Sequence, residues 1–279
     1  MEVMSDQSLS GSEIKLSPRT IRSQVIAQCT PLRPSSAVSG WWARAFAQPS
    51  WPFNYGRAVC MIRDDVGKMV AETRNKLVQF CLDKENDSFE IAYVAWQDDD
   101  VLPISSLVWR ALLDHCVKDG FDISSGVYFS REKHFPQPLI FPEKGHGVTP
   151  FDPDKGWKNV WGCGMGLTLV KMDVYRKMLQ EGLPKDCFGN PEWYRTPGRD
   201  EDVRIVDGCM EHGGTEDLYF CDRAGLLGFK ICVDMGKFCF GFHLDEDNYN
   251  VAYPLEQWAQ YCKNQPIVWP TSDGQVAWS

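Results

Sequence analysis

Apolar and polar residues follow two alternating patterns along the middle of this chain. Short, nearly continuous apolar runs predict β-strands, and stretches in which apolar residues recur every three or four positions predict helices. The expected strands are residues 24–29, 57–62, 89–96, 123–129, 161–170, 230–233 and 237–242. The expected helices are residues 37–47, 66–83, 103–119, 173–180 and 216–227, the last between Thr215 as N-cap and Gly228 as its stop. Because strands and helices alternate, we expect an α/β fold with a mostly parallel sheet covered by helices.

The ends of the chain and two internal segments lack such a pattern. Residues 1–22 are rich in serine and charge, which predicts a disordered tail. Residues 130–158 and 186–214 have no apolar period, and we expect two long loops, a kind of segment that is often functional in compact domains. We therefore expect a single domain over residues 23–245, followed by an aromatic extension, residues 246–279, that packs on it.

Composition limits the classes of partner. The chain has 279 residues and a formal net charge of −9, which argues against unspecific binding to nucleic acid or to an anionic membrane, because both need basic surface. No apolar stretch approaches the roughly 20 residues of a membrane span, and the polar N-terminus lacks the apolar centre of a signal peptide. These features favour a soluble, cytoplasmic protein.

The 11 cysteines do not form a recognisable framework of disulfides or zinc ligands. They are scattered through apolar or amphipathic runs, and no pair has the two-residue gap of a zinc knuckle. We expect reduced thiols in the core, where cysteine packs as a small hydrophobic residue. The cysteines in question are Cys29, Cys60, Cys81, Cys116, Cys163, Cys221 and Cys232.

An acidic run, Asp98, Asp99 and Asp100, directly follows the expected strand 89–96. Three successive carboxylates repel one another and gain nothing from packing, so a cation is expected among them, most simply a divalent metal. Ligands of parallel sheets bind beyond the carboxyl ends of the strands. The run therefore predicts a ligand site at that edge, and a solvated acidic strand end or a calcium-stabilised loop is the alternative.

Several segments together resemble a known family. In chain order they are Thr30-Pro31, residues 72–78, the acidic run with Val101-Leu102-Pro103, residues 162–167, residues 215–220 with 228–230, and Gly241-Phe242-His243. Over residues 25–243 this order resembles the GT-A fold glycosyltransferases of the family 2 type. The resemblance implies a Rossmann-like GT-A sheet. It also implies transfer of one sugar from a nucleotide-diphospho-sugar to a hydroxyl of a saccharide, a glycan or another acceptor.

The resemblance assigns the acidic run to the DxD motif, which binds the metal and the ribose of the donor. Counting from Pro103 favours Asp98 with Asp100, whereas another alignment makes Asp99 the ligand and places Gln97 where an aspartate is expected. His243 falls where the family places a metal-binding histidine, although a structural histidine is the alternative. One imidazole among oxygen ligands shifts preference toward Mn²⁺ over Mg²⁺.

The resemblance also assigns the other groups of the site. Nucleotide-sugar binding falls to Thr30, Arg74, Asn75, Asp98 and Asp99, and Trp161, Gly162 and Gly164 would lie beside the donor sugar and acceptor. In the motif of residues 215–217, Asp217 would be the base that takes the acceptor proton, with Glu216 in reserve. The plainer alternatives are a solvated arginine and acids that only cap a helix, where the helix dipole favours them.

Three other functions stay open. A sugar-phosphate nucleotidyltransferase shares the layered fold but normally has a glycine-rich loop after its first strand, where this chain has Thr30-Pro31-Leu32-Arg33-Pro34. A non-catalytic carbohydrate- or nucleotide-binding module would keep the fold without the reaction. The acceptor could also be a modified base in nucleic acid, but the net negative charge of the chain disfavours this.

Overall fold

The computed structural model describes most of the middle of the chain. The described residues are 23–32, 46–47, 54–63, 70–86, 88–130, 137–145, 148, 156–186, 189–196, 204–206, 209–211, 215–236, 239–244, 268–270 and 276–278. The expected tail, residues 1–22, therefore lies outside the described residues, as do most of the expected helix 37–47 and most of the extension 246–279.

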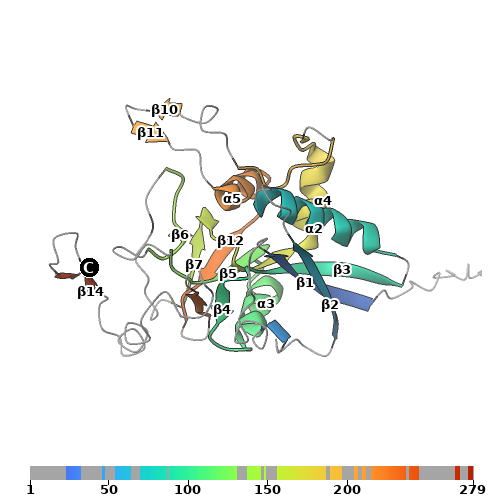
Figure 1. The fold of residues 1–279 in the computed structure, drawn as a ribbon, viewed down its shortest axis with the longest axis horizontal. Coiled ribbons are helices and arrows are strands. Elements are labelled where there is room, and N and C mark those ends of the chain that lie inside the picture. The colour runs from blue at the N-terminus through green and yellow to red at the C-terminus, as the bar shows by residue number, and fades with distance from the viewer. Residues whose placement is uncertain are drawn as a thin grey trace, which may run out of the picture.

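A seven-stranded sheet forms the centre of the fold (Figure 1). Its strands, from one edge to the other, are β2 (Tyr55–Arg63), β1 (Ser23–Leu32), β3 (Phe89–Gln97), β9 (Leu167–Lys171), β5 (Ile123–Gly126), β12 (Ile231–Asp234) and β7 (Trp157–Val160). Strand β9 is antiparallel to both neighbours and β7 to β12, whereas the other pairs are parallel. Five of the seven strands thus share one direction, which confirms an α/β fold around a mixed sheet.

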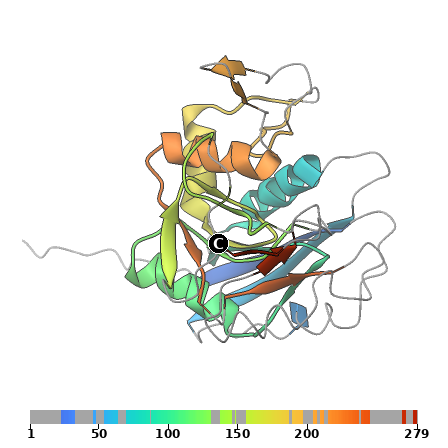
Figure 2. The ribbon, with the colours of Figure 1, turned by 90° about the vertical axis from the view of Figure 1, so that its left-hand side faces the viewer.

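Helices cover both faces of this sheet. Helices α2 (Val70–Lys84), α4 (Met172–Glu181) and α5 (Glu216–Leu226) lie on one face, and α3 (Val108–Lys118) lies on the other (Figures 1 and 2). None of the helices in the described part of the chain is long and apolar enough to cross a membrane.

The alternation along β3 decides which face receives its side chains. Val94 and Trp96 belong to the core beneath α2 and α4, whereas Tyr93 and Ala95 belong to the core over α3. This is the two-residue period of a strand buried on both faces. Because Asp98 continues the alternation of Val94 and Trp96, it emerges on the side of α2.

Short antiparallel pairs bring distant segments to the end of the sheet. Strand β4 (Val101–Pro103) pairs with β13 (Gly241–His243), and β6 (Ile140–Phe141) pairs with β8 (Gly162–Cys163). Two further pairs join segments that are neighbours in the chain: β10 (Arg204–Val206) with β11 (Cys209–Glu211), and β14 (Val268–Pro270) with β15 (Val276–Trp278). The pairing of β4 with β13 places His243 opposite Val101, next to the acidic run.

Some sequence-based boundaries are wrong. Strand β1 does not end before Thr30-Pro31 but runs to Leu32 beside β2. Proline is tolerated there because the pairing of β1 with β3 already ends at Cys29, so on that side no ladder bond is lost. Pro103 belongs to β4, and α3 begins only at Val108.

The segments expected to be single strands or loops also differ. The glycines interrupt the expected strand 161–170, which divides into β8 and β9. The expected loops contain short strands: β6 and the start of β7 lie within 130–158, and β10 and β11 within 186–214. Thr215 is the N-cap of α5, although its side chain makes no cap hydrogen bond within the described structure.

The cysteines agree with the prediction where their side chains are described. Eight are free thiols, and all eight are buried. They are Cys29, Cys60, Cys81, Cys116, Cys163, Cys221, Cys232 and Cys239.

Candidate functional site

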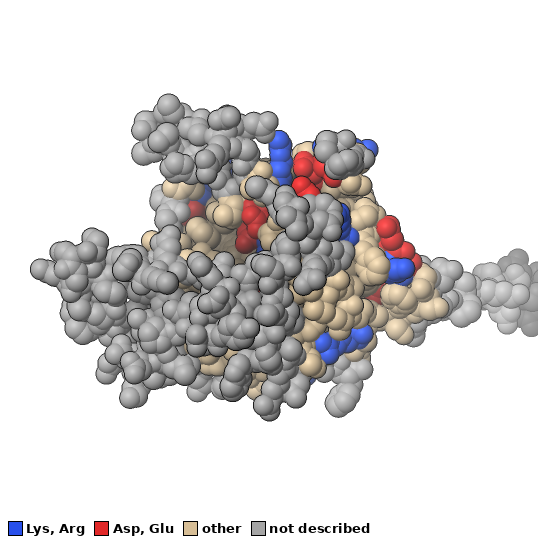
Figure 3. All heavy atoms as spheres, viewed as in Figure 1, with Lys and Arg blue, Asp and Glu red and all other residues tan. Residues whose placement is uncertain are grey.

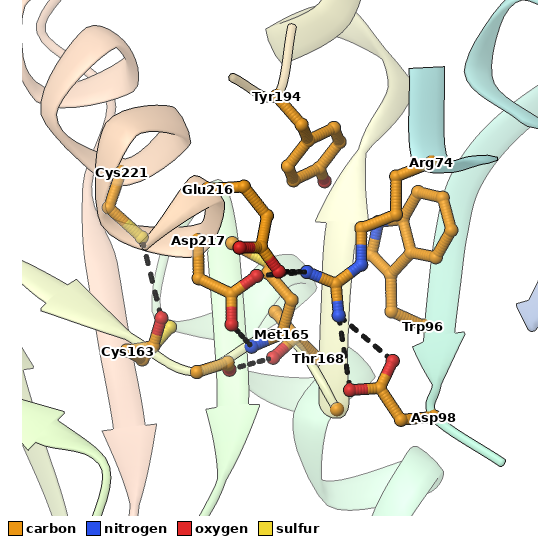
Figure 4. Close-up of polar contacts among 12 residues, drawn as sticks. Arg74, Trp96, Asp98, Cys163, Met165, Thr168, Tyr194, Glu216, Asp217 and Cys221 are labelled. Atoms are coloured by element: carbon orange, nitrogen blue, oxygen red, sulfur yellow. Dashed lines mark hydrogen bonds and ion pairs between the residues drawn. The ribbon is translucent and has the colours of Figure 1, made fainter. Parts of the chain in front are cut away.

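A buried arginine organises the site. Arg74 lies on the inner face of α2, among the buried side chains of Ala71, Leu77 and Val78, and its own side chain is 1% exposed. A charged group is costly to bury unless it is paired and hydrogen-bonded. Its guanidinium points toward the carboxyl end of β3 and the N-terminus of α5 (Figure 4).

Three carboxylates surround that guanidinium. Nη2 of Arg74 donates to both oxygens of Asp98, at 2.9 and 3.1 Å. Nη1 donates to Oε1 of Glu216 at 3.2 Å and to Oδ1 of Asp217. If all are ionised, three negative charges face one positive charge and the cluster carries −2. Figure 3, drawn from the same side as Figure 1, shows acidic atoms in a hollow in the middle of this face.

The environment shifts the pKa values of this cluster. Burial, together with the charges of Glu216 and Asp98 and against the attraction of Arg74, raises the pKa of Asp217 to about 7. Burial also raises the pKa of Asp98, although Arg74 opposes it. For Arg74 itself burial lowers the pKa, but the charges of Asp217, Asp98 and Glu216 more than offset this and raise it. The guanidinium therefore stays charged, and Asp217 exchanges its proton near neutral pH.

Asp217 is held from two directions. Its Oδ1 accepts from Arg74, and its Oδ2 accepts the backbone N–H of Met165 at 3.1 Å. Position in the first turn of α5 adds the favourable field of the helix N-terminus. The side chain as a whole is 14% exposed.

An aromatic wall backs the arginine. The ring of Trp96 lies 5.9 Å and that of Tyr194 5.7 Å from the Arg74 guanidinium carbon, within cation–π range. Trp96 Nε1 donates to the hydroxyl of Tyr175 at 2.7 Å, and that hydroxyl lies 2.7 Å from the hydroxyl of Tyr194. These contacts link α2, β3 and α4, and they restrict the arginine to one orientation.

The glycine-rich segment passes close to the acids. The N–H of Gly166 donates to the hydroxyl of Tyr128 at 2.8 Å, and its carbonyl accepts the N–H of Asp98 at 3.1 Å. A Cβ on Gly166 would lie 2.9 Å from Oδ2 of Asp98, and a Cβ on Gly164 would clash with Tyr128. A side chain at either position would clash, so glycine is required here for lack of space, and the expected place of this segment beside the donor sugar and acceptor stays a prediction.

Asp100 faces His243 rather than Asp98. Nδ1 of His243 lies 2.5 Å from the carbonyl oxygen of Phe129, and Nε2 lies 3.6 Å from Oδ1 of Asp100. The N–H of Leu244 donates to the carbonyl of Asp100 at 2.7 Å. The pairing of β4 with β13 produces this approach, so the proximity of His243 to the acidic run is a feature of the backbone.

The structure thus brings together only part of the expected ligand set. Asp98 is directed to Arg74, and Asp100 to His243. A preformed site with three protein ligands would bring ligand atoms of His, Cys, Asp or Glu close together. Among the described residues, one group of three has its ligand atoms within 4.8 Å of one another, and it consists of cysteines, without Asp98, Asp100 or His243. A preformed three-ligand site of Asp98, Asp100 and His243 is therefore absent from the described structure.

The other expected residues have varied surroundings. Thr30 is fully buried, and its Oγ1 has no hydrogen-bond partner among the described residues. Asn75 exchanges two hydrogen bonds of 2.8 Å with the backbone of Tyr194, which engages both ends of its amide. Asp99 is buried. Trp161 donates to Asp222 at 3.1 Å, and Gly162 packs against Leu218 of α5. Their roles toward a nucleotide-sugar stay predictions.

Sequence reasoning missed the residues that support the arginine. Trp96, Tyr128 and Tyr175 lie in ordinary apolar or amphipathic runs, and Tyr194 lies in the segment 186–214, which has no apolar period; no motif marks any of the four. One signal for Arg74 was available, because it stands three or four positions from Ala71, Leu77 and Val78 on the apolar face of its helix. An arginine in that register has to be buried and paired.

A groove adjoins the other side of α2. It has a volume of about 640 Å³ and lies between α2 and residues 186 and 190–196. Polar and aromatic side chains line it, among them Glu72, Lys76, Phe80 and Arg195. Asn75 and Tyr194 belong both to this groove and to the support of Arg74.

Comparisons with known proteins are sparse. No family model matches the chain, and no curated protein matches it. Among solved structures, the chain is similar to A197 from STIV, with 14% sequence identity, a TM-score of 0.46, and coverage of 91% of this chain and 93% of that one. A likeness at this level assigns neither fold nor function to the chain.

Proposed function

We propose that this protein is a GT-A type glycosyltransferase that moves a sugar from a nucleotide-diphospho-sugar to an acceptor hydroxyl. The observation that carries the proposal is that one arginine forms ion pairs with two acids from separate motifs. Asp98, from the end of β3, and Asp217, from the first turn of α5, are both bound to Arg74. The acid expected to bind the donor, Asp98, and the acid expected to act on the acceptor, Asp217, would thereby lie at the same edge of the sheet.

A divalent metal fits Asp100 and His243 better than it fits Asp98. When His243 donates its Nδ1–H to Phe129, the neutral ring leaves a lone pair on Nε2, as in metal-binding histidines fixed by a backbone carbonyl. That nitrogen and Oδ1 of Asp100 are then two acceptors 3.6 Å apart, an arrangement that a cation stabilises. Such an ion supplies charge neutralisation for the diphosphate leaving group.

Residues of the chain would supply the other functions that the reaction needs. Asp217 would accept the proton of the acceptor hydroxyl, and a pKa of about 7 suits a base that works near neutral pH. Arg74 would act as a positioning residue, because it holds Asp217 and Asp98 in fixed relation without facing the solvent. The buried glycine segment would keep the backbone close to both acids.

A second candidate has a specific observation in its favour. The same arginine that aligns Asp98 and Asp217 also occupies their oxygens, as it would in a purely structural cluster. A binding module that retains the fold without the reaction would keep this arrangement. Binding of nucleotide-sugar without any transfer or hydrolysis would favour it.

The first test is a thermal-shift panel of nucleoside diphosphates and nucleotide-sugars with Mn²⁺ or Mg²⁺. A ligand at about 100 times its dissociation constant should stabilise the protein by about 2.7 kcal/mol. In the double variant Asp98→Asn and Asp100→Asn, the metal-dependent part of the shift should disappear. The melting temperature without ligand should change little, because an amide oxygen at position 98 can still accept from Arg74.

Asp173→Asn is the matched control, since Asp173 is an exposed acid on α4, 78% exposed. It should keep the whole nucleotide shift. The single variant Asp100→Asn should account for most of the loss, because Asp100 faces His243. Metal-dependent nucleotide binding that survives in the double variant would contradict the assignment.

His243→Ala tests which metal is used. An imidazole ligand favours Mn²⁺ over Mg²⁺, so we expect Mn²⁺ to support nucleotide binding better in the unmodified protein and the gap to narrow in the variant. Titration of nucleotide binding with each metal measures this ratio. A lower melting temperature with an unchanged metal ratio would show that His243 only holds β13 to Phe129.

A further inference from the structure

Three buried cysteines converge beneath α2, on the sheet face that also receives Arg74. Cys29 comes from β1, Cys60 from β2 and Cys81 from α2, and their side chains are 0%, 7% and 0% exposed. Their Sγ atoms all lie within 4.8 Å of one another. The Sγ atoms of Cys29 and Cys81 are 3.9 Å apart.

The backbone explains why they meet. Cys29 and Cys60 are register partners on neighbouring parallel strands, so their side chains leave the sheet on the same face. Helix α2 covers that face and places Cys81 over them. Cys81 follows Arg74 by seven residues, about two helical turns, so both lie on the same side of the helix.

The spacing suits sulfur ligands that share an ion. With a metal–sulfur bond of ~2.3 Å, two ligands of a tetrahedral or trigonal centre lie ~3.8–4.0 Å apart. The distance between the Cys29 and Cys81 sulfurs falls in this range. It is also close to ordinary contact between packed thiols, which behave as small hydrophobic groups. An experiment has to separate these two states.

We propose that Cys29, Cys60 and Cys81 form a metal site for a thiophilic closed-shell cation, Zn²⁺ or Cu⁺. Thiolates select these ions, whereas Mg²⁺ and Mn²⁺ prefer oxygen. Binding is a ligand exchange, in which each coordinating thiol gives its proton to solvent and no electron is transferred. This site is separate from Asp100 and His243 and does not depend on the proposed transferase reaction.

The structure also predicts a consequence of binding. An ion at the cluster would tie α2 to β1 and β2 and so hold the helix that carries Arg74. The ion binds the folded arrangement, so it should raise the melting temperature in a concentration-dependent way.

Titration of the reduced, chelator-treated full chain with Cd²⁺ tests the proposal. We expect a sulfur-to-cadmium charge-transfer band in the ultraviolet that saturates at one equivalent, with proton release. Zn²⁺ added in one arm and Cu⁺ in another should displace Cd²⁺, and the tighter competitor identifies the preferred ion. Cys60→Ser, at the least buried of the three positions, should weaken Cd²⁺ binding at least tenfold.

Cys116→Ser is the matched control, because Cys116 is a buried thiol of α3 outside the cluster. It should bind Cd²⁺ like the unmodified chain. If circular dichroism shows that Cys60→Ser is unfolded, Cys81→Ala replaces it. Absence of a band saturating at one equivalent, or equal binding by cluster and control variants, would overturn the proposal. Oxidation of two of these thiols to a disulfide without any Cd²⁺ binding would overturn it as well.

Discussion

Replacing Arg74 by alanine is expected to lower the free energy of unfolding by about 3–5 kcal/mol at pH 8, the typical result of removing one partner from a buried ion pair. Asp98, Glu216 and Asp217 would be left facing one another without their shared cation. Urea unfolding followed by circular dichroism measures the effect. Arg176→Ala is the matched control, because Arg176 also bridges two acids, Glu85 and Asp173, but is 30% exposed. It should lose no more than about 1 kcal/mol.

The effect should depend on pH in a defined direction. The folded-state pKa of Asp217 is raised to about 7 from an ordinary value near 3.8, so between these values the folded chain binds more protons than the unfolded one. The contribution of Asp217 to the free energy of unfolding of the unmodified protein is therefore greatest below pH 4. It is lost as the pH rises toward 7, by at most ~1.4 kcal/mol per pH unit. In Arg74→Ala, protonation of the uncompensated acids should reduce the destabilisation at pH 5. Equal losses in Arg74→Ala and Arg176→Ala at pH 8 would contradict this account.

Asp217→Asn is expected to reduce sugar transfer by about 10²–10⁴ while nucleotide binding stays within a few-fold. The amide keeps an oxygen for Arg74 but cannot take a proton from the acceptor. Single-turnover transfer and nucleotide titration, measured on the same preparation, separate the two effects.

Asp173→Asn provides the control for this prediction. Asp173 lies on α4, is 78% exposed and pairs with Arg176, so the variant changes one acid outside the arginine cluster. It should retain transfer. If Asp217→Asn transfers at the normal rate, the role passes to Glu216 or to a reaction without a protein base.

Local patterns predicted the elements because they report burial along one segment. The apolar run of β3 and the three-to-four spacing of α2 each exist within a few residues, and both elements are found close to their expected positions. The direction of β9 was not predictable in this way. Residues 167–170 are buried whichever way the strand runs, and its antiparallel pairing with β3 and β5 follows from the connections around it.

The site shows the same limit. The acids of residues 98–100 and 216–217 were marked by their sequence, and the structure brings Asp98, Glu216 and Asp217 onto one guanidinium. The sequence did not indicate which partner each aspartate of the acidic run contacts, because consecutive side chains point in different directions after a strand ends. Asp98 meets Arg74, and Asp100 meets His243 across β4 and β13. Such pairings depend on strand register, which no single segment encodes.

The position of Arg74 in the chain also bears on the order of folding. Asp98 follows it by only 24 residues, but Asp217 follows it by 143. At a synthesis rate of 5–20 residues per second, Asp217 is added about 7–30 s after Arg74. During that interval α2 has only Asp98 to balance the charge it would carry into the core. We therefore expect Arg74 to pair first with Asp98, one charge against one, and the surplus of negative charge in the cluster to arise only when Glu216 and Asp217 of α5 join it.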